Sequence, residues 1–319
     1  MVTENMSVWG VIVTYKPSAE HIERVVVSAL KQVNYLVIVD NSCDLHTRRI
    51  LEKLLATRQE TALLSLHTQI FLVFNTSNVG LAAAMNQAIA MAQNKNADYV
   101  LILDQDSCLR DGAVRLLLAA IQRYGSRLDV GCVVATNIDL NRYRIEGFQA
   151  DYSRRRGGYF DERIQEMFFA KNSGMLIPIS TFKLVGQYRE DYFVDGLDHE
   201  FCLRIREAGR HILWVRDAHI DHELGSPTRY RLWSLDIPVP LHAAWRYYYV
   251  ARSTMMTTRD HIRRFPLDVS LYAIFHLPLF LAVLLATRER PTVFRFMIRG
   301  FADALRRRTG VVVLPAATS

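Results

Sequence analysis

The chain has 319 residues, of which 50% are hydrophobic, so it is long enough to bury the core of one large α/β domain together with an appendage. Its four cysteines form no CxxC pair, which argues against a disulfide framework and favours free thiols in the reducing cytoplasm. The formal net charge is +7, and the first residues, MVTENMSVWG, show no basic segment followed by an apolar one, so we expect no secretory signal.

The first half of the chain alternates apolar runs of strand length with helical patterns. Apolar residues that are continuous along a run are typical of strands buried on both faces, as in a parallel sheet covered by helices. We therefore expect an α/β fold with a mostly parallel central sheet. The predicted strands are residues 8–14, 35–39, 69–74, 99–103 and 130–135, and the predicted helices are residues 19–32, 45–57, 81–94 and 110–124.

The second half of the chain is more mixed, and beyond Pro227 we expect a linker and a helical tail. This pattern predicts a catalytic domain over residues 1–228 and a C-terminal helical region over residues 229–319. The other predicted elements are a loop or hairpin over residues 142–161, a strand with a turn at Ser173 and Gly174 within residues 168–178, a helix over residues 198–208 that stops at Gly209, and a short strand over residues 211–215.

Most of the positive charge lies in the tail. Residues 259–308 contain ten arginines and four acidic residues, a net charge of +6. These arginines flank an apolar run of 18 residues, 269–286 (VSLYAIFHLPLFLAVLLA). Arginine on both sides of apolar residues fits anionic lipid headgroups better than nucleic acid, so the tail indicates an anionic membrane surface as the partner.

Three arrangements are open for the apolar run at residues 269–286. It could lie on the cytoplasmic surface of the membrane, it could be buried in a homo-oligomer interface or in the core, or it could span the bilayer. His276 and Pro278 disfavour a span, because an ionisable group is costly inside the bilayer and proline kinks a helix. We expect peripheral attachment to the inner face of the membrane, with burial as the alternative.

Polar residues stand where four of the predicted strands end. They are Thr14 and Tyr15, Asp40 to Ser42, Asn75 to Gly80, and Asp104 to Asp106. Ligands bind at the carboxyl ends of the strands in doubly wound sheets, so these four signals predict one common site. The first strand is not followed by G-x-G-x-x-G, and no G-x-x-x-x-G-K-[ST] occurs, which argues against a dinucleotide dehydrogenase and a P-loop NTPase.

Asp104 and Asp106 are the most informative of these residues. Two carboxylates directly after an apolar strand repel each other, and each needs solvent or a cation. Oxygen ligands of this kind hold Mg²⁺ or Mn²⁺, usually with substrate phosphates. The alternative is a solvated turn.

The remaining polar signals have two interpretations each. Asp40 could bind a ribose or a base, or it could be a cap. The small residues around Gly80 could let a ligand approach the backbone, or they could only pack a helix tightly. The acidic cluster at Asp195, Asp198 and Glu200 could supply a general base, or it could favour a helix N-terminus.

The order of motifs resembles the family 2 inverting glycosyltransferases, which have the GT-A fold, and most closely the bacterial rhamnosyltransferases that use dTDP-L-rhamnose. The motifs that carry the resemblance are VIVTYKP, VDNSCD, NVGLAAAMNQAI, LILDQDS, KNSGMLIP, FVDGLDHEFCLRIREAGRHI, DHELGSP and RYYYVARS. They cover residues 8–253 in the family's order, whereas the tail after Arg259 carries no specific motif.

The resemblance implies donor-binding roles for several residues. Asp40 would contact the pyrimidine, and Ser173 and Gly174 would line the donor-sugar or acceptor pocket. The diphosphate would be clamped by Arg246, Tyr247 or Arg252, although Ser253 stands where similar enzymes often carry asparagine. The donor-binding residues implied in this way are Thr14, Tyr15, Asp40, Asn78, Gly80, Asp104, Gln105, Ser173, Gly174, Arg246 and Arg252.

The resemblance also implies a metal site and a base. Asp106 and His222 would hold Mg²⁺ or Mn²⁺, and Asp198 would be the catalytic base. The family usually has two adjacent acids at the base motif, but Leu197 precedes Asp198 here, which leaves Asp195 as a rival.

The implied activity is inverting transfer of L-rhamnose from dTDP-L-rhamnose to a hydroxyl of a saccharide. The acceptor would be a lipid-linked saccharide or another oligosaccharide in the synthesis of a bacterial cell-surface polysaccharide such as O-antigen. The alternatives are UDP-galactofuranose, UDP-glucose or UDP-N-acetylglucosamine as the donor, a nucleotidyltransferase, and a scaffold that only binds nucleotide sugars.

Overall fold

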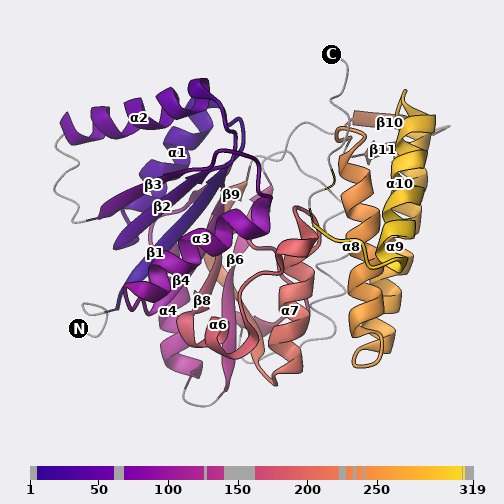
Figure 1. Ribbon diagram of the computed structural model, residues 1–319. Coiled ribbons are helices and arrows are strands. Elements are labelled where there is room, and N and C mark those ends of the chain that lie inside the picture. The colour runs from indigo at the N-terminus through magenta and orange to yellow at the C-terminus, as the bar shows by residue number, and fades with distance from the viewer. Residues whose placement is uncertain are drawn as a thin grey trace.

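The computed structural model describes residues 6–60, 68–125, 128–139, 162–222, 228–232, 235–239, 241–310 and residue 312. A central sheet is covered by helices on both faces, and a group of C-terminal helices packs beside it (Figure 1). The predicted α/β fold with a C-terminal helical appendage is confirmed. The expected loop or hairpin at residues 142–161 and the residue Pro227 lie outside the described residues.

The first half of the chain forms the parallel part of the sheet. Its strands are β1 (Val8–Thr14), β2 (Tyr35–Asp40), β3 (Gln69–Phe74) and β4 (Tyr99–Asp104), and their order is β3-β2-β1-β4. The helices between and after them are α1 (Ala19–Leu30), α2 (Leu45–Glu60), α3 (Leu81–Asn94) and α4 (Ala113–Tyr124). All of these elements were expected, because buried parallel strands and amphipathic helices leave strong periodic patterns.

The second half of the sheet contains antiparallel pairs. Strand β8 (Met175–Pro178) runs antiparallel to both β4 and β6 (Val130–Asp139), and β6 runs parallel to β9 (His211–His222). Two short strands, β5 (Ser107–Leu109) and β7 (Ile164–Glu166), pair antiparallel with β9. The parallel arrangement therefore holds on the N-terminal side of the sheet and ends at β8.

Several sequence-based boundaries are wrong, and two of the errors involve β9. This strand was expected to end at residue 215, but it continues to His222 because its second half pairs with β6 and β5. The helix expected from residue 110 starts at Ala113, because the chain is still bonded to β9 at Arg110, whose backbone N–H donates to the His219 carbonyl at 3.1 Å. Pairing between segments far apart in the chain leaves no signal in a short stretch of sequence.

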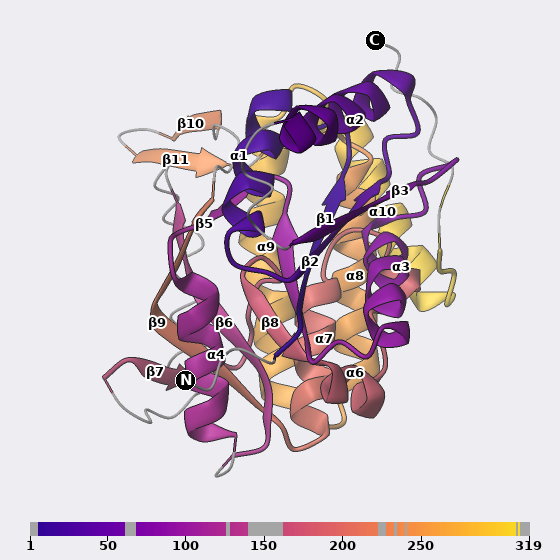
Figure 2. The ribbon, with the colours of Figure 1, turned by 90° about the vertical axis from the view of Figure 1, so that its left-hand side faces the viewer.

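The two faces of the sheet carry separate hydrophobic clusters. Side chains alternate between the faces along a strand. In β1, Val8 and Ile12 pack in the cluster beneath α1 and α4, whereas Trp9 and Val11 pack in the cluster beneath α3 and α7 (Leu197–Glu207) (Figure 2). Because helices cover both faces of these strands, a ligand can reach them at the strand ends.

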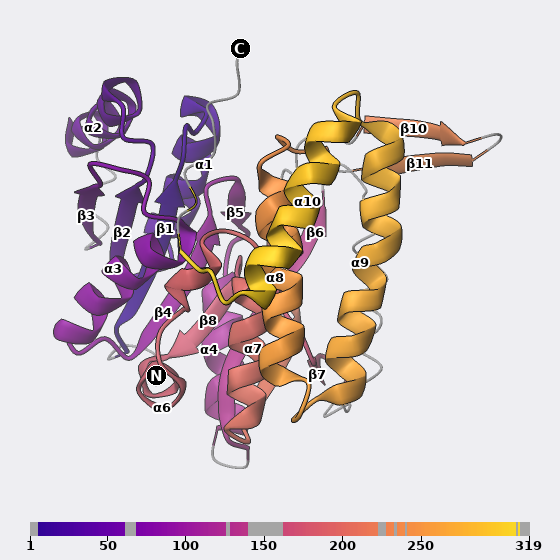
Figure 3. The same ribbon diagram turned by 45° about the vertical axis from the view of Figure 1, so that its right-hand side comes forward.

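The helical tail packs against the part of the chain that contains the sheet, in part through α7. Helix α8 (Arg246–His261) contacts α7 and α10 (Arg290–Leu305), and α9 (Pro266–Ala286) packs on α8 on the outer side (Figure 3). A hairpin of β10 (Thr228–Leu232) and β11 (Leu235–Val239), which was not expected, precedes these helices. The division into two domains at residue 228 stays a prediction.

The turn before α3 needs glycine because of a protein contact. Gly80 has φ +89°, and a Cβ built on it would lie 2.5 Å from Phe193 Cδ2 and 2.9 Å from the Phe193 carbonyl oxygen. That carbonyl accepts a hydrogen bond from the backbone N–H of Leu81, at 2.6 Å. The group that approaches Gly80 closely is therefore Phe193. This contact favours the interpretation that Gly80 allows tight packing of the helix, rather than the approach of a ligand.

This contact predicts a large stability loss for Gly80→Ala. We expect about 3 kcal/mol, because the variant combines a strained positive φ with a clash against backbone and ring. Gly209→Ala is the matched control, since Gly209 has φ +73° but no described heavy atom lies within 4 Å of an added Cβ. Strain alone should cost this control about 1 kcal/mol in urea unfolding. Equal losses in the two variants would contradict the role of Phe193.

Candidate functional site

Strand ends bring three of the candidate residues to one edge of the sheet. Thr14 of β1 lies beside Asp40 of β2 in the parallel register, and Val13 lies beside Asp104 of β4. Carboxyl ends of adjacent parallel strands meet at the same edge. Thr14, Asp40 and Asp104 therefore share that edge.

Asp104, Asp106 and His222 form a cluster that could hold a metal ion. One potential ligand atom from each residue lies within 4.8 Å of the others. The β5–β9 pairing creates the cluster, because it sets Ser107 opposite His222. Asp106 Oδ1 then lies 3.4 Å from His222 Nδ1, and Ser107 Oγ lies 2.5 Å from the same nitrogen. Two carboxylates and an imidazole suit Mg²⁺ or Mn²⁺.

The electrostatics of Asp104 also fit a cation site. Burial raises the pKa of Asp104 to about 6, and the neighbouring Asp106 and Asp198 act in the same direction, while His222 and Lys171 oppose them. A carboxylate in this position is unfavourable without a positive partner. A divalent cation would supply this positive partner. The alternative, a solvated turn, does not explain why His222 lies beside the two carboxylates.

Ser173 and Gly174 hold the end of β4 in place. The backbone N–H of Asp104 donates to Ser173 Oγ at 3.1 Å, and Ser173 is buried. Gly174 has φ +79°, and a Cβ there would lie 2.9 Å from Ile220 Cδ1 and 3.1 Å from Ala135 Cβ. Ser173 thus fixes the end of β4 at Asp104, and Gly174 is required by packing against β6 and β9.

Gln105 joins the ends of β1 and β4. Its Oε1 accepts a hydrogen bond from the Tyr15 backbone N–H at 2.8 Å, and its Nε2 donates to the Tyr15 carbonyl at 3.3 Å. The Tyr15 side chain remains 44% exposed. Gln105 is therefore engaged with the backbone, whereas the Tyr15 ring is free to meet a ligand at this edge.

Asp40 is held by hydrogen bonds at the end of β2. Its Oδ1 accepts from Thr14 Oγ1 at 2.9 Å and from the Ser42 backbone N–H at 3.1 Å. Both Thr14 and Asp40 are buried beneath the edge. These contacts fix the orientation of the carboxylate.

Asn41 is a site residue that the sequence analysis did not single out. Its Nδ2 donates to Asn78 Oδ1 at 2.7 Å, and its Oδ1 accepts from the Val79 backbone N–H at 3.0 Å. Asn78 Oδ1 also accepts from the Gly80 backbone N–H at 3.0 Å. Asn41 thus ties the loop after β3 to the end of β2, and its place directly after Asp40 was the only signal available.

The three clustered acids have three different environments. Asp195 forms a two-pronged ion pair with Arg246, with the closest contact between Asp195 Oδ1 and Arg246 Nη2 at 2.9 Å. Glu200 is 1% exposed and pairs with Arg204 Nε at 2.8 Å. Asp198 lies at the first turn of α7 and has neither arginine. Of the three, Asp198 is the carboxylate that is not engaged in an arginine pair within the described residues.

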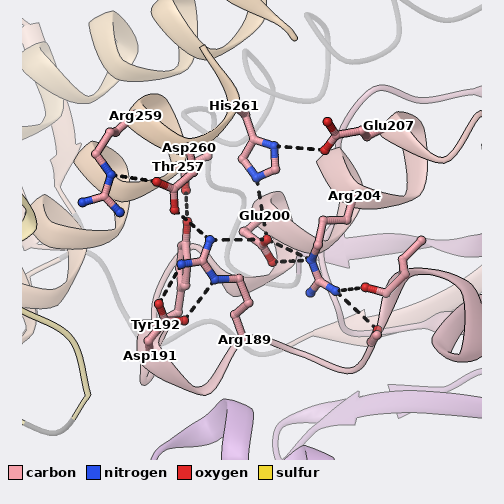
Figure 4. Close-up of polar contacts among 12 residues, drawn as sticks. Arg189, Asp191, Tyr192, Glu200, Arg204, Glu207, Thr257, Arg259, Asp260 and His261 are labelled. Atoms are coloured by element: carbon pink, nitrogen blue, oxygen red, sulfur yellow. Dashed lines mark hydrogen bonds and ion pairs between the residues drawn. The ribbon is translucent and has the colours of Figure 1, made fainter. Parts of the chain in front are cut away.

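Glu200 is the centre of a structural network rather than a base. Arg189 and His261 approach Glu200 Oε1 to 3.8 and 3.6 Å, from the left and from above in Figure 4. Arg189 also pairs with Asp260 of α8 at 2.8 Å. A buried carboxylate is tolerated only with such partners, so this network fastens α7 to α8.

His199 is the second residue that the sequence analysis missed. Its Nδ1 lies 3.0 Å from Asp198 Oδ1, and its ring packs against Phe169 and Tyr272 at centroid distances of 5.0 and 4.9 Å. Burial acts to raise the pKa of Asp198, but the contacts with His199 and the charge of Lys171 outweigh it and lower that pKa. Asp198 is thereby kept ionised.

The structure separates the two candidate diphosphate arginines. Arg246 is only partly buried, and the Asp195 and Asp104 carboxylates both raise its pKa, which puts it within electrostatic range of the metal cluster. Arg252 is 0% exposed, and its guanidinium donates to the carbonyls of Gly310 and Asp191, each at 2.8 Å. The guanidinium of Arg252 is therefore buried against the backbone in this structure, and its contact with the donor stays a prediction.

Tyr247 is also turned into the protein. It is 3% exposed, and its hydroxyl accepts a hydrogen bond from the His242 backbone N–H at 2.9 Å. Of the residues considered for the diphosphate, only Arg246 has a partly exposed cationic group, which pairs with Asp195 and interacts electrostatically with Asp104.

Comparisons with known proteins identify the family of the chain. A family profile described as "Glycosyl transferase family 2" matches residues 10–182. The chain is 24% identical to dTDP-rhamnosyl transferase RfbF of Shigella flexneri over 309 residues, which is 96% of this chain and 98% of that protein.

Two solved structures share the fold. GalNAc-T7 with UDP, GalNAc and Mn²⁺ has a TM-score of 0.56 at 15% identity, over 95% of this chain and 56% of that one. S. aureus TarS 1–349 has a TM-score of 0.50 at 14% identity, over 94% of this chain and 90% of that one. The chain is a member of glycosyl transferase family 2 with a GT-A fold.

Proposed function

We propose that this glycosyltransferase moves L-rhamnose from dTDP-L-rhamnose to a hydroxyl of a saccharide acceptor, with inversion at the anomeric carbon. The observation that carries the donor assignment is the similarity to a dTDP-rhamnosyl transferase over nearly the whole of both chains. UDP-galactofuranose, UDP-glucose and UDP-N-acetylglucosamine are the alternative donors, because the shape of the pocket decides sugar selectivity.

The strand-end edge holds the donor. Asp40 contacts the pyrimidine of the nucleotide, the exposed Tyr15 ring lies against it, and Arg246 binds the diphosphate. Asp104, Asp106 and His222 would hold Mg²⁺ or Mn²⁺, and the ion would supply positive charge to stabilise the departing nucleotide diphosphate. Asp195 acts on the donor indirectly, because its two-pronged pair with Arg246 fixes the direction of the guanidinium.

Asp198 is the catalytic base. It accepts the proton of the acceptor hydroxyl while the hydroxyl oxygen attacks the anomeric carbon from the face opposite the diphosphate. The new carbon–oxygen bond forms as the bond to the diphosphate breaks, so a single displacement inverts the centre. His199 holds the Asp198 carboxylate from the side.

The acceptor is a lipid-linked saccharide on the cytoplasmic face of the membrane, where the enzyme is peripherally attached. The basic, apolar tail supports this placement, since only 28% of the apolar part of α9 is buried in the protein. Attachment would raise the local concentration of a membrane-bound acceptor. Association of two copies through the C-terminal helices is the alternative use of this surface.

If Asp104, Asp106 and His222 bind a metal ion, variants of these residues should lose the stabilisation that the metal gives the parent chain. A ligand at about 100 times its Kd stabilises the folded state by about 2.7 kcal/mol, so Mn²⁺ with dTDP should raise the melting temperature of the parent chain. Asp106→Asn and His222→Ala should abolish this rise. Asp221→Asn is the matched control, because Asp221 is adjacent in sequence but pairs with Arg110 at 2.7 Å. Retention of the rise in both cluster variants would contradict the assignment.

The donor assignment predicts that dTDP-rhamnose stabilises the parent chain more than the three UDP-sugars do. A thermal-shift screen in the presence of Mn²⁺ measures this directly. A larger shift with any UDP-sugar than with dTDP-rhamnose would replace the proposed donor.

Replacement of Asp198 and Asp195 should separate chemistry from binding. Asp198→Asn should lower kcat about 100-fold or more while donor binding is kept, since it removes the proton acceptor. Asp195→Asn should mainly raise the KM for the donor, because it frees Arg246. Turnover measured against donor concentration distinguishes them, and an Asp198→Asn enzyme with parental kcat would remove Asp198 from the mechanism.

His199→Gln should shift the pH profile of the reaction. Asp198 must be ionised to accept a proton, so activity falls as the pH drops through its pKa. His199 lowers that pKa, and without the imidazole burial raises it. The acid limb of kcat/KM should therefore move to higher pH. A uniform loss of rate at every pH, with the limb unmoved, would indicate that His199 only supports the fold.

A further inference from the structure

The His199 imidazole, which contacts the proposed base, is enclosed by two aromatic rings. Phe169 lies in the segment between β7 and β8, and its ring centroid is 5.0 Å from that of His199. Tyr272 comes from α9 in the tail and lies 4.9 Å from His199, and the two aromatic rings are 5.9 Å apart. Both are buried. We call these two residues the ring clamp, since close packing against them leaves the imidazole few rotamers.

The orientation of Asp198 depends on the His199 ring. Within the described residues, the hydrogen bonds to the Asp198 side chain come from His199, whose Nδ1 lies 3.0 Å and whose backbone nitrogen lies 2.9 Å from Asp198 Oδ1. The backbone bond does not involve the side chain of residue 199, but the ring bond forms only when the imidazole faces Asp198. The groups that fix the His199 ring therefore also fix the Asp198 carboxylate.

Tyr272 is itself held in place at the start of α7. His276, one turn later on α9, packs edge-on against its ring at 4.5 Å, and the His276 Nδ1 lies 2.8 Å from the Tyr272 carbonyl oxygen. Burial lowers the pKa of His276 to about 4, so this imidazole is neutral and donates its Nδ1–H to that carbonyl. At the other end of the side chain, a Cβ built on Gly196, the residue before α7, would lie 3.5 Å from the Tyr272 hydroxyl.

Tyr272 also affects the electrostatics around Asp198. Burial raises the pKa of Tyr272 well above its usual value, and Asp198, Tyr192 and Asp195 act in the same direction, so the ring stays neutral. A neutral ring excludes water on its side of the Asp198–His199 pair, and a hydrogen bond is stronger where water is excluded. Other titratable groups act on Asp198 from the part of the chain before the tail: Lys171, Asp104, Tyr188 and Cys202.

We infer that Tyr272 is a positioning residue for the reaction: together with Phe169 it holds the His199 imidazole in the rotamer that orients the Asp198 carboxylate. The C-terminal helical region thereby completes the site of the base. This inference rests on the proposed role of Asp198. It gives the tail a part in the chemical step that is separate from any attachment, although the sequence of the tail carries no specific motif.

Removal of the Tyr272 ring should slow the reaction without weakening donor binding. Tyr272→Leu should lower kcat about tenfold or more, because a small misplacement of a reacting group is costly, and should leave the KM for the donor unchanged. Tyr272→Phe keeps the ring and should recover most of the lost rate. Steady-state kinetics against donor concentration measure both effects. An unchanged kcat in Tyr272→Leu would overturn the inference.

Phe280→Leu is the matched control for loss of a buried ring from α9. Phe280 is buried, and its ring packs on His276 and Phe301, at 5.9 and 5.7 Å. This variant should lose melting temperature as Tyr272→Leu does, but should keep the parental kcat. A similar fall of kcat in both variants would show that the rate follows the stability of the tail, which would also overturn the inference.

A double-mutant cycle tests whether Tyr272 acts through His199. If it does, the variant that combines Tyr272→Leu with His199→Gln should be no slower than the slower single variant, since the second change removes nothing further. Losses of kcat that multiply would overturn the positioning role. Tyr272→Met, which fills more of the space, takes the place of Tyr272→Leu in the cycle if the leucine variant does not fold.

The pH profile supplies a readout that a purely structural role would not move. His199 lowers the pKa of Asp198, so loosening its ring should raise that pKa. The acid limb of kcat/KM should therefore move to higher pH in Tyr272→Leu, in the same direction as in His199→Gln, and should stay in place in Phe280→Leu. An unmoved limb in Tyr272→Leu would contradict the inference.

Asp198→Asn, measured in the same assay, separates this inference from the proposed function. Parental kcat in Asp198→Asn would remove the proposed base, and the role of Tyr272 would fall with it. Loss of kcat in Asp198→Asn together with multiplying losses in the Tyr272–His199 cycle would overturn the positioning role alone and leave the proposed base in place.

Discussion

The antiparallel pairing of β5 with the end of β9 is the contact on which the site depends. It places His222 against Ser107 and within 3.4 Å of Asp106, although these residues are more than a hundred positions apart. Without it, Asp104 and Asp106 would be two neighbouring carboxylates whose repulsion only solvent could relieve. With it, burial, like charge and an imidazole define a place for a divalent cation, and Ser173 fixes the end of β4 beneath it.

The second constraint is the distribution of charge around α7. Three acids stand within six residues, and the fold gives each a separate partner: Arg246 for Asp195, His199 for Asp198, and the Arg189–Arg204–His261 network for Glu200. Because Glu200 is fastened to α8, the first turn of α7 is held rigidly beside the donor edge. The same helices carry α9, so the surface proposed to meet the membrane and the proposed base belong to one packed unit.

Local patterns predicted those parts of the fold whose signals are contained in a short segment. Buried strands such as β1 and β4, and helix α7, which ends two residues before Gly209, follow from apolar runs and a glycine stop signal that the sequence shows directly. Segments stabilised by distant partners were not predictable: β5 is too short to have a pattern, and the second half of β9 reads as a polar loop until β6 and β5 pair with it. Asn41 and His199 were not assigned a role, because their roles depend on hydrogen bonds to Asn78 and Asp198 that only the structure shows.

The sequence by itself determined the fold class, the family and the residues at the strand ends, because motif order and hydrophobic periodicity are properties of the chain. Only the tertiary structure decided which charged groups meet. It turned Arg252 into the protein and left Arg246 partly exposed. It also placed Phe193 against Gly80 and buried Asp268 and His276 of α9 beside apolar residues of the same helix. The physical reason is that burial and electrostatic pairing depend on distances between segments, which the local sequence does not contain.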